Sequence, residues 1–305
     1  MRGEFQNFIK ETEKVLVGFE RTAEAVLIAM MCRGHILLEG PPGVAKTTLA
    51  KTVAKLVDVN FRRVQFTPDL LPTDIIGTVI FNPRTGEFSV RKGPIFTNLL
   101  LADEINRASP KTQSALLEAM EERQVTIEGN TFALEEPFIV IATQNPVEQE
   151  GTYPLPEAQL DRFLFKMDVG YPGREEEKEI MRKVLGGFKE IKPVFSKKQI
   201  LSFREILSQI HVSDNIIEYV ASIVSALREN PVVAWGPSPR ASLALINVSR
   251  AVAFSENRTY VKPRDVRKFA VEILQHRIGI KPESETEGVT TKKVVTDVLE
   301  QVDAV

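Results

Sequence analysis

Short apolar runs alternate with amphipathic stretches through the first half of the chain. Several of the runs are apolar throughout, which is typical of parallel strands that are buried on both faces. We expect strands at residues 35–39, 61–66, 99–102, 138–143 and 163–169. Apolar residues at helical spacing predict helices over residues 4–16, 22–32, 47–57 and 110–122. The pattern therefore predicts an α/β domain with a parallel sheet covered by helices on both faces.

Two further segments alternate polar and apolar residues on either side of a turn, which predicts β-hairpins. The first hairpin pairs residues 77–81 with 87–91 around an Asn-Pro-Arg-Thr-Gly turn, inside a long interruption over residues 70–96. The second hairpin pairs residues 124–127 with 131–134 around a Glu-Gly-Asn turn.

The pattern changes at Pro172-Gly173, because the segments that follow are helical in period. We expect helices over residues 175–185, 216–227, 240–254 and 266–278. The chain is therefore divided into an α/β domain over residues 1–171 and a smaller all-α domain over residues 172–305.

Composition excludes several classes of protein. The 305 residues are 43% hydrophobic and 26% charged with a net charge of −2, which is ordinary for a globular protein. The single cysteine, Cys32, cannot form an internal disulfide, and no apolar run reaches membrane-spanning length. We expect a cytoplasmic protein. The absence of a basic excess gives no electrostatic support for nucleic-acid binding, and the three histidines lack metal-ligand spacing.

A glycine- and proline-rich turn joins the first predicted strand to the next helix. Its sequence is Gly40-Pro41-Pro42-Gly43-Val44-Ala45-Lys46-Thr47-Thr48. The spacing is that of a phosphate-binding loop, whose backbone N–H groups wrap an anionic phosphate chain. Lys46 would reach the β- and γ-phosphates, and the Thr47 hydroxyl would bind Mg²⁺. Ala45 stands where glycine is usual, which argues against a left-handed backbone there. The alternative is a plain turn before a helix with a surface lysine.

An acidic pair, Asp103-Glu104, follows the third predicted strand. Asp103 would hold Mg²⁺, usually through its waters, and Glu104 would polarise the water that attacks the γ-phosphorus. The carboxyl edge of a parallel sheet places such groups beside bound phosphates. The alternative is an acidic strand cap.

Three more polar residues are candidates for the same chemistry. Asn145 follows the neighbouring strand, where its amide could orient the attacking water or simply form a turn. Arg162 precedes the last strand and could complete the site of a neighbouring subunit, or pair with Asp161 on the surface. Arg240 opens a helix of the second domain, where it could contact the nucleotide or remain an exposed arginine.

The chain resembles the AAA+ ATPases, and within them the MoxR family, over nearly its whole length. The motifs that carry the resemblance are Gly43-Val44-Ala45-Lys46-Thr47, Gly86-Glu87-Phe88, Gly93-Pro94-Ile95-Phe96, Leu101-Ala102-Asp103-Glu104-Ile105-Asn106-Arg107, Ala142-Thr143-Gln144-Asn145-Pro146 and Leu155-Pro156-Glu157-Ala158-Gln159-Leu160-Asp161-Arg162-Phe163.

The resemblance implies an AAA+ P-loop αβα sandwich followed by a helical lid, with ATP and Mg²⁺ as cofactors. It implies that Asn145 is sensor 1, Arg162 the arginine finger and Arg240 sensor 2, and that Val17-Gly18 lies near the adenine. It also implies a hexameric ring with each site between two subunits. Residues 70–96 then correspond to a hairpin inserted into helix 2, which MoxR proteins share with magnesium chelatase ATPase subunits and MCM helicases.

MoxR proteins resemble chaperones that mature or activate other complexes, often alongside a protein with a von Willebrand A domain. A remodelling ATPase of this kind is the favoured function. A nucleic-acid motor or a magnesium-chelatase-like ATPase subunit is the alternative, and the motor is disfavoured by charge and by the lack of an attached DNA-binding domain. A GTPase-like switch is disfavoured because no Asn-Lys-x-Asp motif occurs.

Overall fold

A computed structural model describes residues 2–84, 86–146, 151–187 and 189–303, which form two compact units. The α/β unit comprises Asn7–Leu155 and Met167–Leu201. The helical unit comprises Met1–Gln6, Pro156–Lys166 and Ser202–Val305. Whereas the sequence predicts a single boundary after residue 171, this division groups residues 156–166 with the C-terminal helices.

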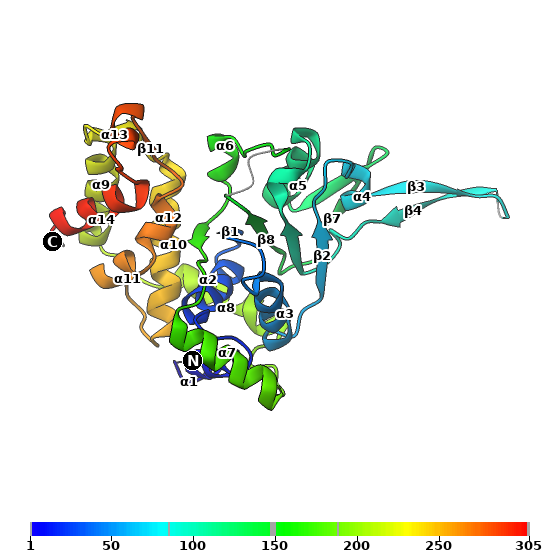
Figure 1. Ribbon diagram of the computed structural model, residues 1–305, viewed down its shortest axis with the longest axis horizontal. Helices are drawn as coiled ribbons and strands as arrows, with labels where there is room; N and C mark the ends of the chain where they lie inside the picture. Colours follow the sequence, from blue (N-terminus) through cyan, green and yellow to red (C-terminus); the bar gives the residue numbers. More distant parts are fainter. Residues whose placement is uncertain (1, 85, 147–150, 188, 304–305) are drawn as a thin grey trace. The chain divides into compact units, whose positions relative to one another are not determined.

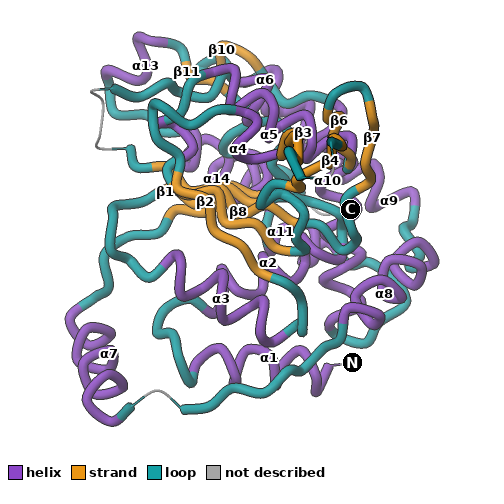
Figure 2. The backbone as a smooth tube through the Cα atoms, turned by 90° about the vertical axis from the view of Figure 1, so that its right-hand side faces the viewer, coloured by secondary structure: helices purple, strands orange, loops and turns teal. Residues whose placement is uncertain are grey.

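The α/β unit is built on a five-stranded sheet in the order β2-β5-β8-β1-β9 (Figure 2). The strands are β1 (Ile36–Glu39), β2 (Phe61–Gln65), β5 (Leu99–Asp103), β8 (Ile139–Gln144) and β9 (Phe165–Asp168). The pairings of β2 with β5, β5 with β8 and β8 with β1 are parallel. The three central strands are almost completely buried, which explains their apolar sequences.

Helices cover both faces of this sheet, as the sequence predicts. Helices α2 (Glu20–Met31) and α3 (Lys46–Leu56) lie on one side, and α5 (Pro110–Glu122) lies on the other (Figures 1 and 2). The long apolar face of α2 is buried from Thr22 to Met31. The α/β unit also contains α4 (Pro72–Ile76), η1 (Ile105–Arg107) and α7 (Arg174–Gly186). The elements α1 (Arg2–Glu13), α8 (Lys197–Gln209) and β9 have residues in both units.

Both predicted hairpins are confirmed. Strands β3 (Gly77–Asn82) and β4 (Glu87–Lys92) pair antiparallel, and β6 (Gln124–Ile127) pairs with β7 (Asn130–Ala133). Thr85, in the predicted turn of the first hairpin, lies outside the described residues. Side chains of β6 alternate between buried and exposed, whereas β4 is exposed throughout. The β3–β4 hairpin accordingly projects away from the sheet (Figure 1).

The helical unit confirms the predicted helices α9 (Asp214–Glu229) and α10 (Pro239–Ser255). The single helix predicted over residues 266–278 is wrong, because the backbone leaves helical geometry at Phe269 and separates α11 (Pro263–Lys268) from α12 (Ala270–Leu274). The unit also contains α6 (Glu157–Leu160), α13 (Pro282–Thr286), α14 (Thr291–Gln301) and a short antiparallel ribbon of β10 (Val233–Trp235) and β11 (Gly279–Ile280). Among the described residues, every helix is too short or too polar to cross a lipid bilayer.

Candidate functional site

The glycine-rich loop between β1 and α3 has a backbone shaped for close approach. A Cβ atom on Gly40 would lie 2.0 Å from the carbonyl oxygen of Val169, so only glycine fits there. Gly43 has φ +82°, and Ala45, directly before α3, has φ 57° and ψ 19°. The expectation that alanine argues against a left-handed backbone at this position is therefore wrong. Ala45 adopts that conformation at a cost of roughly 1–2 kcal/mol, and left-handed residues of this kind occur in the backbone N–H concavities that bind anions.

Lys46, the first residue of α3, lies half-buried beneath this loop, and Thr47 and Thr48 follow it in the first turn. Its Nζ donates a hydrogen bond to the carbonyl oxygen of Gly40 at 2.5 Å. Burial lowers the pKa of the Lys46 ammonium, and the carboxylates of Asp103, Glu104 and Glu39 oppose that shift. The cation therefore lies in the electrostatic field of the acidic pair that the sequence predicts.

Asp103 ends the buried strand β5 between β2 and β8, and both neighbouring strands contact its carboxylate. The Thr143 hydroxyl on β8 donates to Asp103 Oδ1 at 2.6 Å. The Arg63 guanidinium on β2 donates twice to Asp103 Oδ2, at 3.0 and 2.7 Å. Sequence reasoning missed both partners, because Arg63 belongs to no motif and Thr143, although it lies in the Ala142–Pro146 motif, was given no role.

Glu104 follows the strand with a left-handed backbone at φ 57° and ψ 52°. Such a conformation is costly for a non-glycine residue and is concentrated at functional positions. The Glu104 N–H donates to the Thr143 hydroxyl at 2.8 Å, so one threonine holds both acidic residues. Glu104 Oε2 accepts hydrogen bonds from Gln65 at 2.8 Å and from Arg107 at 3.1 Å.

The carboxyl edge of the sheet brings most predicted residues together. Gln144, the last residue of β8, pairs with Glu39, and its carbonyl accepts from Gly40 N–H at 3.1 Å. Asn145 therefore follows β8 beside the start of the loop, where it is buried. Arg162 and Arg240 belong instead to the helical unit, after α6 and in the first turn of α10.

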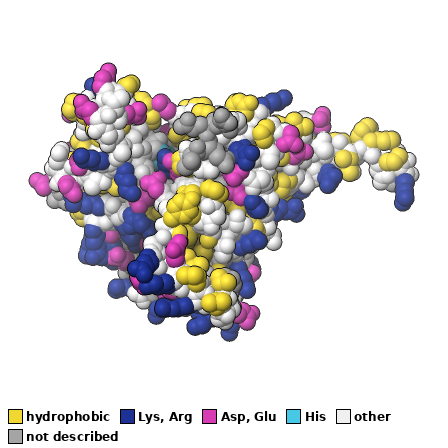
Figure 3. Space-filling model, viewed as in Figure 1, with side chains coloured by type: hydrophobic (Ala, Val, Ile, Leu, Met, Phe, Trp, Pro, Cys, Tyr) yellow, Lys and Arg dark blue, Asp and Glu magenta, His cyan; other side chains and the backbone are white. Residues whose placement is uncertain are grey.

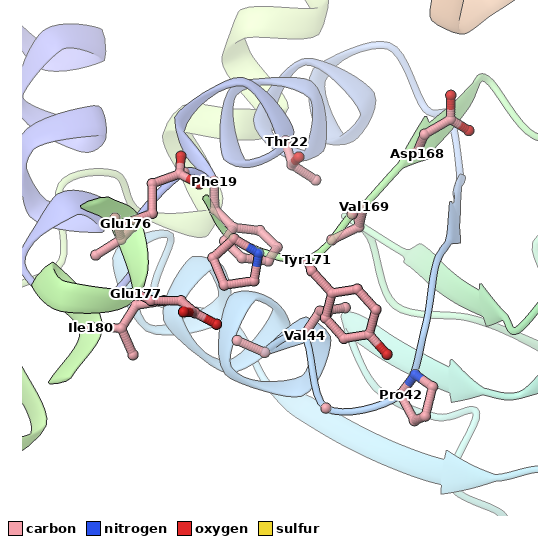
Figure 4. A pocket seen from close by; sticks show the side chains of 16 residues that line it. Phe19, Thr22, Pro42, Val44, Asp168, Val169, Tyr171, Glu176, Glu177 and Ile180 are labelled. Carbon is pink, nitrogen blue, oxygen red and sulfur yellow. The ribbon is translucent and has the colours of Figure 1, made fainter. Parts of the chain in front are cut away.

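A cavity of about 540 Å³ adjoins the phosphate loop within the α/β unit (Figure 4). Its lining comes from the start of α2, the loop, the segment after β9 and the helix α7; the residues are Val17, Gly18, Phe19, Thr22, Pro42, Gly43, Val44, Ala45, Asp168, Val169, Gly170, Tyr171, Pro172, Glu176, Glu177 and Ile180. The volume is that of a small-molecule site. Val17 and Gly18 are among these lining residues.

Sequence reasoning missed the cavity's aromatic residues, Phe19 and Tyr171, and Ile180 of α7. Phe19 directly follows the Val17-Gly18 pair, and Tyr171 directly precedes the predicted domain boundary. The aromatic residue at each of these two junctions was the feature of the sequence that could have indicated the cavity lining. Flat apolar side chains of this kind can contact a planar base.

Comparisons with known proteins agree with this geometry. The model of the ATPase family associated with various cellular activities (AAA) matches residues 35–165, and the AAA lid domain model matches residues 225–298. The chain is 45% identical to the chaperone MoxR1 of Mycobacterium tuberculosis, over 96% of this chain and 80% of that protein. It is also 45% identical to the protein YeaC of Bacillus subtilis, over 96% of this chain and 92% of YeaC.

The same similarity extends to three-dimensional structure. A crystal structure of a Cytophaga hutchinsonii protein regarded as an ATPase superimposes with a TM-score of 0.92 at 45% identity, covering 100% of this chain and 96% of that one. The fold and the sequence of this chain, including its lid domain, thus match those of these relatives over nearly the whole length. The chain belongs to the MoxR family of AAA+ ATPases.

Proposed function

We propose that this ATPase needs Mg²⁺, assembles into a ring, expected to be a hexamer, and uses ATP hydrolysis to remodel or activate partner protein complexes. The observation that carries the proposal is the convergence of Lys46, Asp103 and Glu104 at one edge of the sheet. Phosphoryl transfer to water requires a cation that binds the phosphates, a carboxylate that holds the metal and a carboxylate that activates the water.

The residues of the loop and the sheet edge have separate roles in this proposal. The N–H groups of residues 43–48 cradle the phosphates, and Lys46 exchanges the Gly40 carbonyl for a phosphate oxygen. Thr47 and Asp103 would hold Mg²⁺ through the oxygen ligands that this ion prefers, and the metal would supply positive charge beside the phosphates. Glu104 and Asn145 orient the attacking water.

The remaining candidates complete the site from other positions. The 540 Å³ cavity at Val17 and Gly18 takes the nucleoside. Arg162 acts as an arginine finger in the site of a neighbouring subunit, and Arg240 contacts the nucleotide when the lid closes.

The catalytic assignment is tested with a matched pair of variants. Glu104→Gln should keep ATP affinity within a few-fold and lower kcat by about 10² to 10⁴, since only water activation is lost. Lys46→Ala should lose ATP binding. Glu118→Gln, an exposed glutamate on α5, serves as the control and should behave like the wild type. Equal hydrolysis by wild type and Glu104→Gln would exclude the proposed role of Glu104.

The proposed contact with partners is the β3–β4 hairpin. Phe81 and Phe88 face each other across it with ring centroids 5.1 Å apart, yet they remain 54% and 74% exposed. Ile80 and Val90 are exposed beside them, and Figure 3 shows hydrophobic side chains along the projecting arm. Packing of one ring on the other thus leaves most of this apolar surface in water, which is typical of an interaction site.

The hairpin is tested separately from catalysis. Replacement of residues 82–86 by a short Gly-Ser turn, or Phe88→Ser, should leave basal ATP hydrolysis unchanged. Proteins that co-purify with a Glu104→Gln trap should be lost when the trap also carries the altered hairpin. Unchanged recovery of the same partners would remove the hairpin from the mechanism.

A further inference from the structure

Thr143 is a polar residue near the end of the buried strand β8, whose preceding residues are all apolar. Its side chain is only 1% exposed. The register pairs Ala102 of β5 with Ala142 of β8, so the next residues, Asp103 and Thr143, lie beside each other. A buried hydroxyl costs free energy unless it is hydrogen-bonded. Thr143 finds its partners in the acidic pair.

The Thr143 hydroxyl contacts the two acidic residues in opposite senses. It donates to Asp103 Oδ1 at 2.6 Å, which is the usual length for a hydrogen bond from a hydroxyl to a carboxylate. A hydroxyl has one proton, so its oxygen is left to accept from the Glu104 backbone N–H at 2.8 Å. One buried side chain therefore holds two consecutive residues, and the direction of both hydrogen bonds is fixed.

The backbone turn at Glu104 is what lets two consecutive residues act at one place. Successive side chains of an extended strand point to opposite faces, but Glu104 leaves the strand with φ 57° and ψ 52°. Arg63 and Gln65, two residues apart on β2, are hydrogen-bonded to each other at 2.7 Å. Arg63 donates to Asp103 at 2.7 Å, and Gln65 donates to Glu104 at 2.8 Å. Both carboxylates therefore lie on the same side of the sheet edge, and the Thr143 hydroxyl holds the turn that brings them there.

Burial distinguishes Thr143 from the arginines that contact the same carboxylates. The side chains of Arg63 and Arg107 are 47% and 42% exposed. Exposed partners of this kind can be replaced by a ligand or by water at little cost. A buried hydroxyl with both of its hydrogen bonds in use cannot move without breaking them. The Thr143 contacts can therefore persist while the exposed donors are exchanged.

We propose that Thr143 is a positioning residue for ATP hydrolysis, because its hydroxyl fixes the carboxylates of Asp103 and Glu104 relative to each other. The proposal rests on the roles proposed above for these two residues. The hydrogen bond to Oδ1 sets the direction in which Asp103 presents its oxygens to Mg²⁺, as groups behind a metal ligand commonly do. The hydrogen bond from the Glu104 N–H sets the turn from which the second carboxylate reaches the attacking water.

Two substitutions separate the hydroxyl from the rest of the side chain. Thr143→Val replaces the hydroxyl by a methyl group and should lower kcat by about 10²-fold, the usual cost of misplacing a catalytic group by about 1 Å. Thr143→Ser keeps the hydroxyl and should recover most of that loss. Thr112→Val is the matched control, because Thr112 is also buried and donates to the Leu70 carbonyl at 2.7 Å, not to the acidic pair. This variant should keep the wild-type kcat.

Nucleotide binding gives a readout that does not depend on turnover. A fluorescent, non-hydrolysable ATP analogue is titrated once in EDTA and once in excess Mg²⁺. The wild type should bind more tightly with Mg²⁺, and Asp103→Asn should lose this gain. Thr143→Val should keep the affinity in EDTA, since the phosphate loop is intact, and its gain with Mg²⁺ should be smaller by about tenfold. Urea unfolding verifies that each variant folds, and Thr143→Ala replaces Thr143→Val if that variant does not.

The outcomes separate this inference from the assignment on which it rests. If Asp103→Asn keeps both kcat and the gain with Mg²⁺, the metal role of Asp103 fails, and the role of Thr143 fails with it. If Asp103→Asn loses both whereas Thr143→Val keeps them, the metal role stands and Thr143 only packs, which overturns the inference. An equal loss in Thr143→Ser would assign the effect to the methyl group, and an equal loss in Thr112→Val would assign it to any buried hydroxyl. Either of these results also overturns the inference.

Discussion

The two units each contain an arginine–aspartate pair of the same length in a different environment. Arg63 and Asp103 in the α/β unit are 2.7 Å apart, as are Arg277 and Asp161 in the helical unit. The Arg63 side chain is 47% exposed, whereas that of Arg277 is 4% exposed. Water and salt weaken the first pair, so it can exchange partners at little cost. The second pair cannot lose a partner without leaving a buried charge.

This difference matches what each region has to do. In the proposed mechanism Asp103 and Glu104 change partners when nucleotide, metal and water bind. Three of their present donors, Arg63, Gln65 and Arg107, have partly exposed side chains. Arg277 instead donates to backbone carbonyl oxygens close to Arg162. The proposed reaction does not require these carbonyls to change partner. The partly exposed pairs thus take part in the proposed reaction, whereas the buried Arg277–Asp161 pair fixes the position of the backbone around Arg162.

The largest expected effect concerns the residue that the buried pair positions. Arg162→Ala should lower kcat by about 10³ or more and leave ATP affinity nearly unchanged, because a finger acts on the transition state of a neighbour. Specific activity of the wild type should rise with protein concentration, and the variant should lose that rise. Arg174→Ala, at an exposed position of α7, is the control. A concentration-dependent rise that survives in Arg162→Ala would show that another group completes the site.

The comparison itself is tested by removing each arginine of the two pairs. Arg277→Ala should lower the free energy of unfolding by about 3–5 kcal/mol, since Asp161 and the carbonyl oxygens around it lose the five hydrogen bonds that Arg277 donates. Arg63→Ala should cost less than about 1 kcal/mol. Urea unfolding followed by circular dichroism measures both, and fluorescence of Trp235, the single tryptophan, reports on the helical unit. Similar losses in the two variants would contradict the distinction between an exchangeable and a permanent pair.

The sequence alone predicted those elements whose residue pattern has one common structural interpretation. The strands β1, β5 and β8 were predicted because a strand buried on both faces must be apolar throughout. The phosphate loop and the acidic pair were predicted because their spacing follows from the shape of a phosphate chain. The β3–β4 hairpin was predicted from alternation and a glycine turn, although nothing in the alternation indicated that it would remain exposed.

Long-range polar contacts could not be predicted in this way. Arg277 lies 116 residues after Asp161, and an arginine after a helix ordinarily indicates an exposed end. Ala45 was expected to avoid a left-handed backbone, because residue propensity describes only the local cost of that conformation. The end of α11 at Phe269 was missed because the apolar spacing continues across it. In each case tertiary contacts outweigh the local preference.

A third test concerns the pH dependence of stability. The two units should behave alike in this property, because each buries a histidine. His35 Nε2 donates to the Met120 carbonyl at 3.1 Å, and its Nδ1 accepts from the Val140 N–H at 2.9 Å. The ring therefore has no room for a second proton, and burial lowers the pKa of His35 to about 3. Burial also holds the pKa of His276 well below its usual value.

The sign of the pH dependence follows from these shifts. Below the ordinary histidine pKa of 6.5 the unfolded chain binds protons that the folded chain does not, so stability falls as the pH falls toward 3. Each buried histidine contributes to this loss at pH values below 6.5, because its ring stays neutral in the folded chain and gains a proton in the unfolded chain. Urea unfolding at pH 7.5 and 5.5 measures the loss, and His276→Gln should remove about half of it. Equal stability of the wild type at both pH values would mean that the rings accept protons in the folded state.

The smallest expected effect concerns the exchangeable contacts at the sheet edge. Gln65 accepts from Arg63 at 2.7 Å and donates to Glu104 at 2.8 Å, so it links the two carboxylates through exposed or half-exposed side chains. In the proposed mechanism Glu104 exchanges this donor for the attacking water, and a hydrogen bond of this kind is worth about 1 kcal/mol. Gln65→Leu should therefore raise basal ATP hydrolysis by up to about fivefold at unchanged ATP affinity. Steady-state kinetics with Gln124→Leu, an exposed glutamine of β6, as control measures the change. A fall in kcat would instead mean that Gln65 holds Glu104 in its working position, and the contacts at this edge would then resemble the fixed contacts around Arg277.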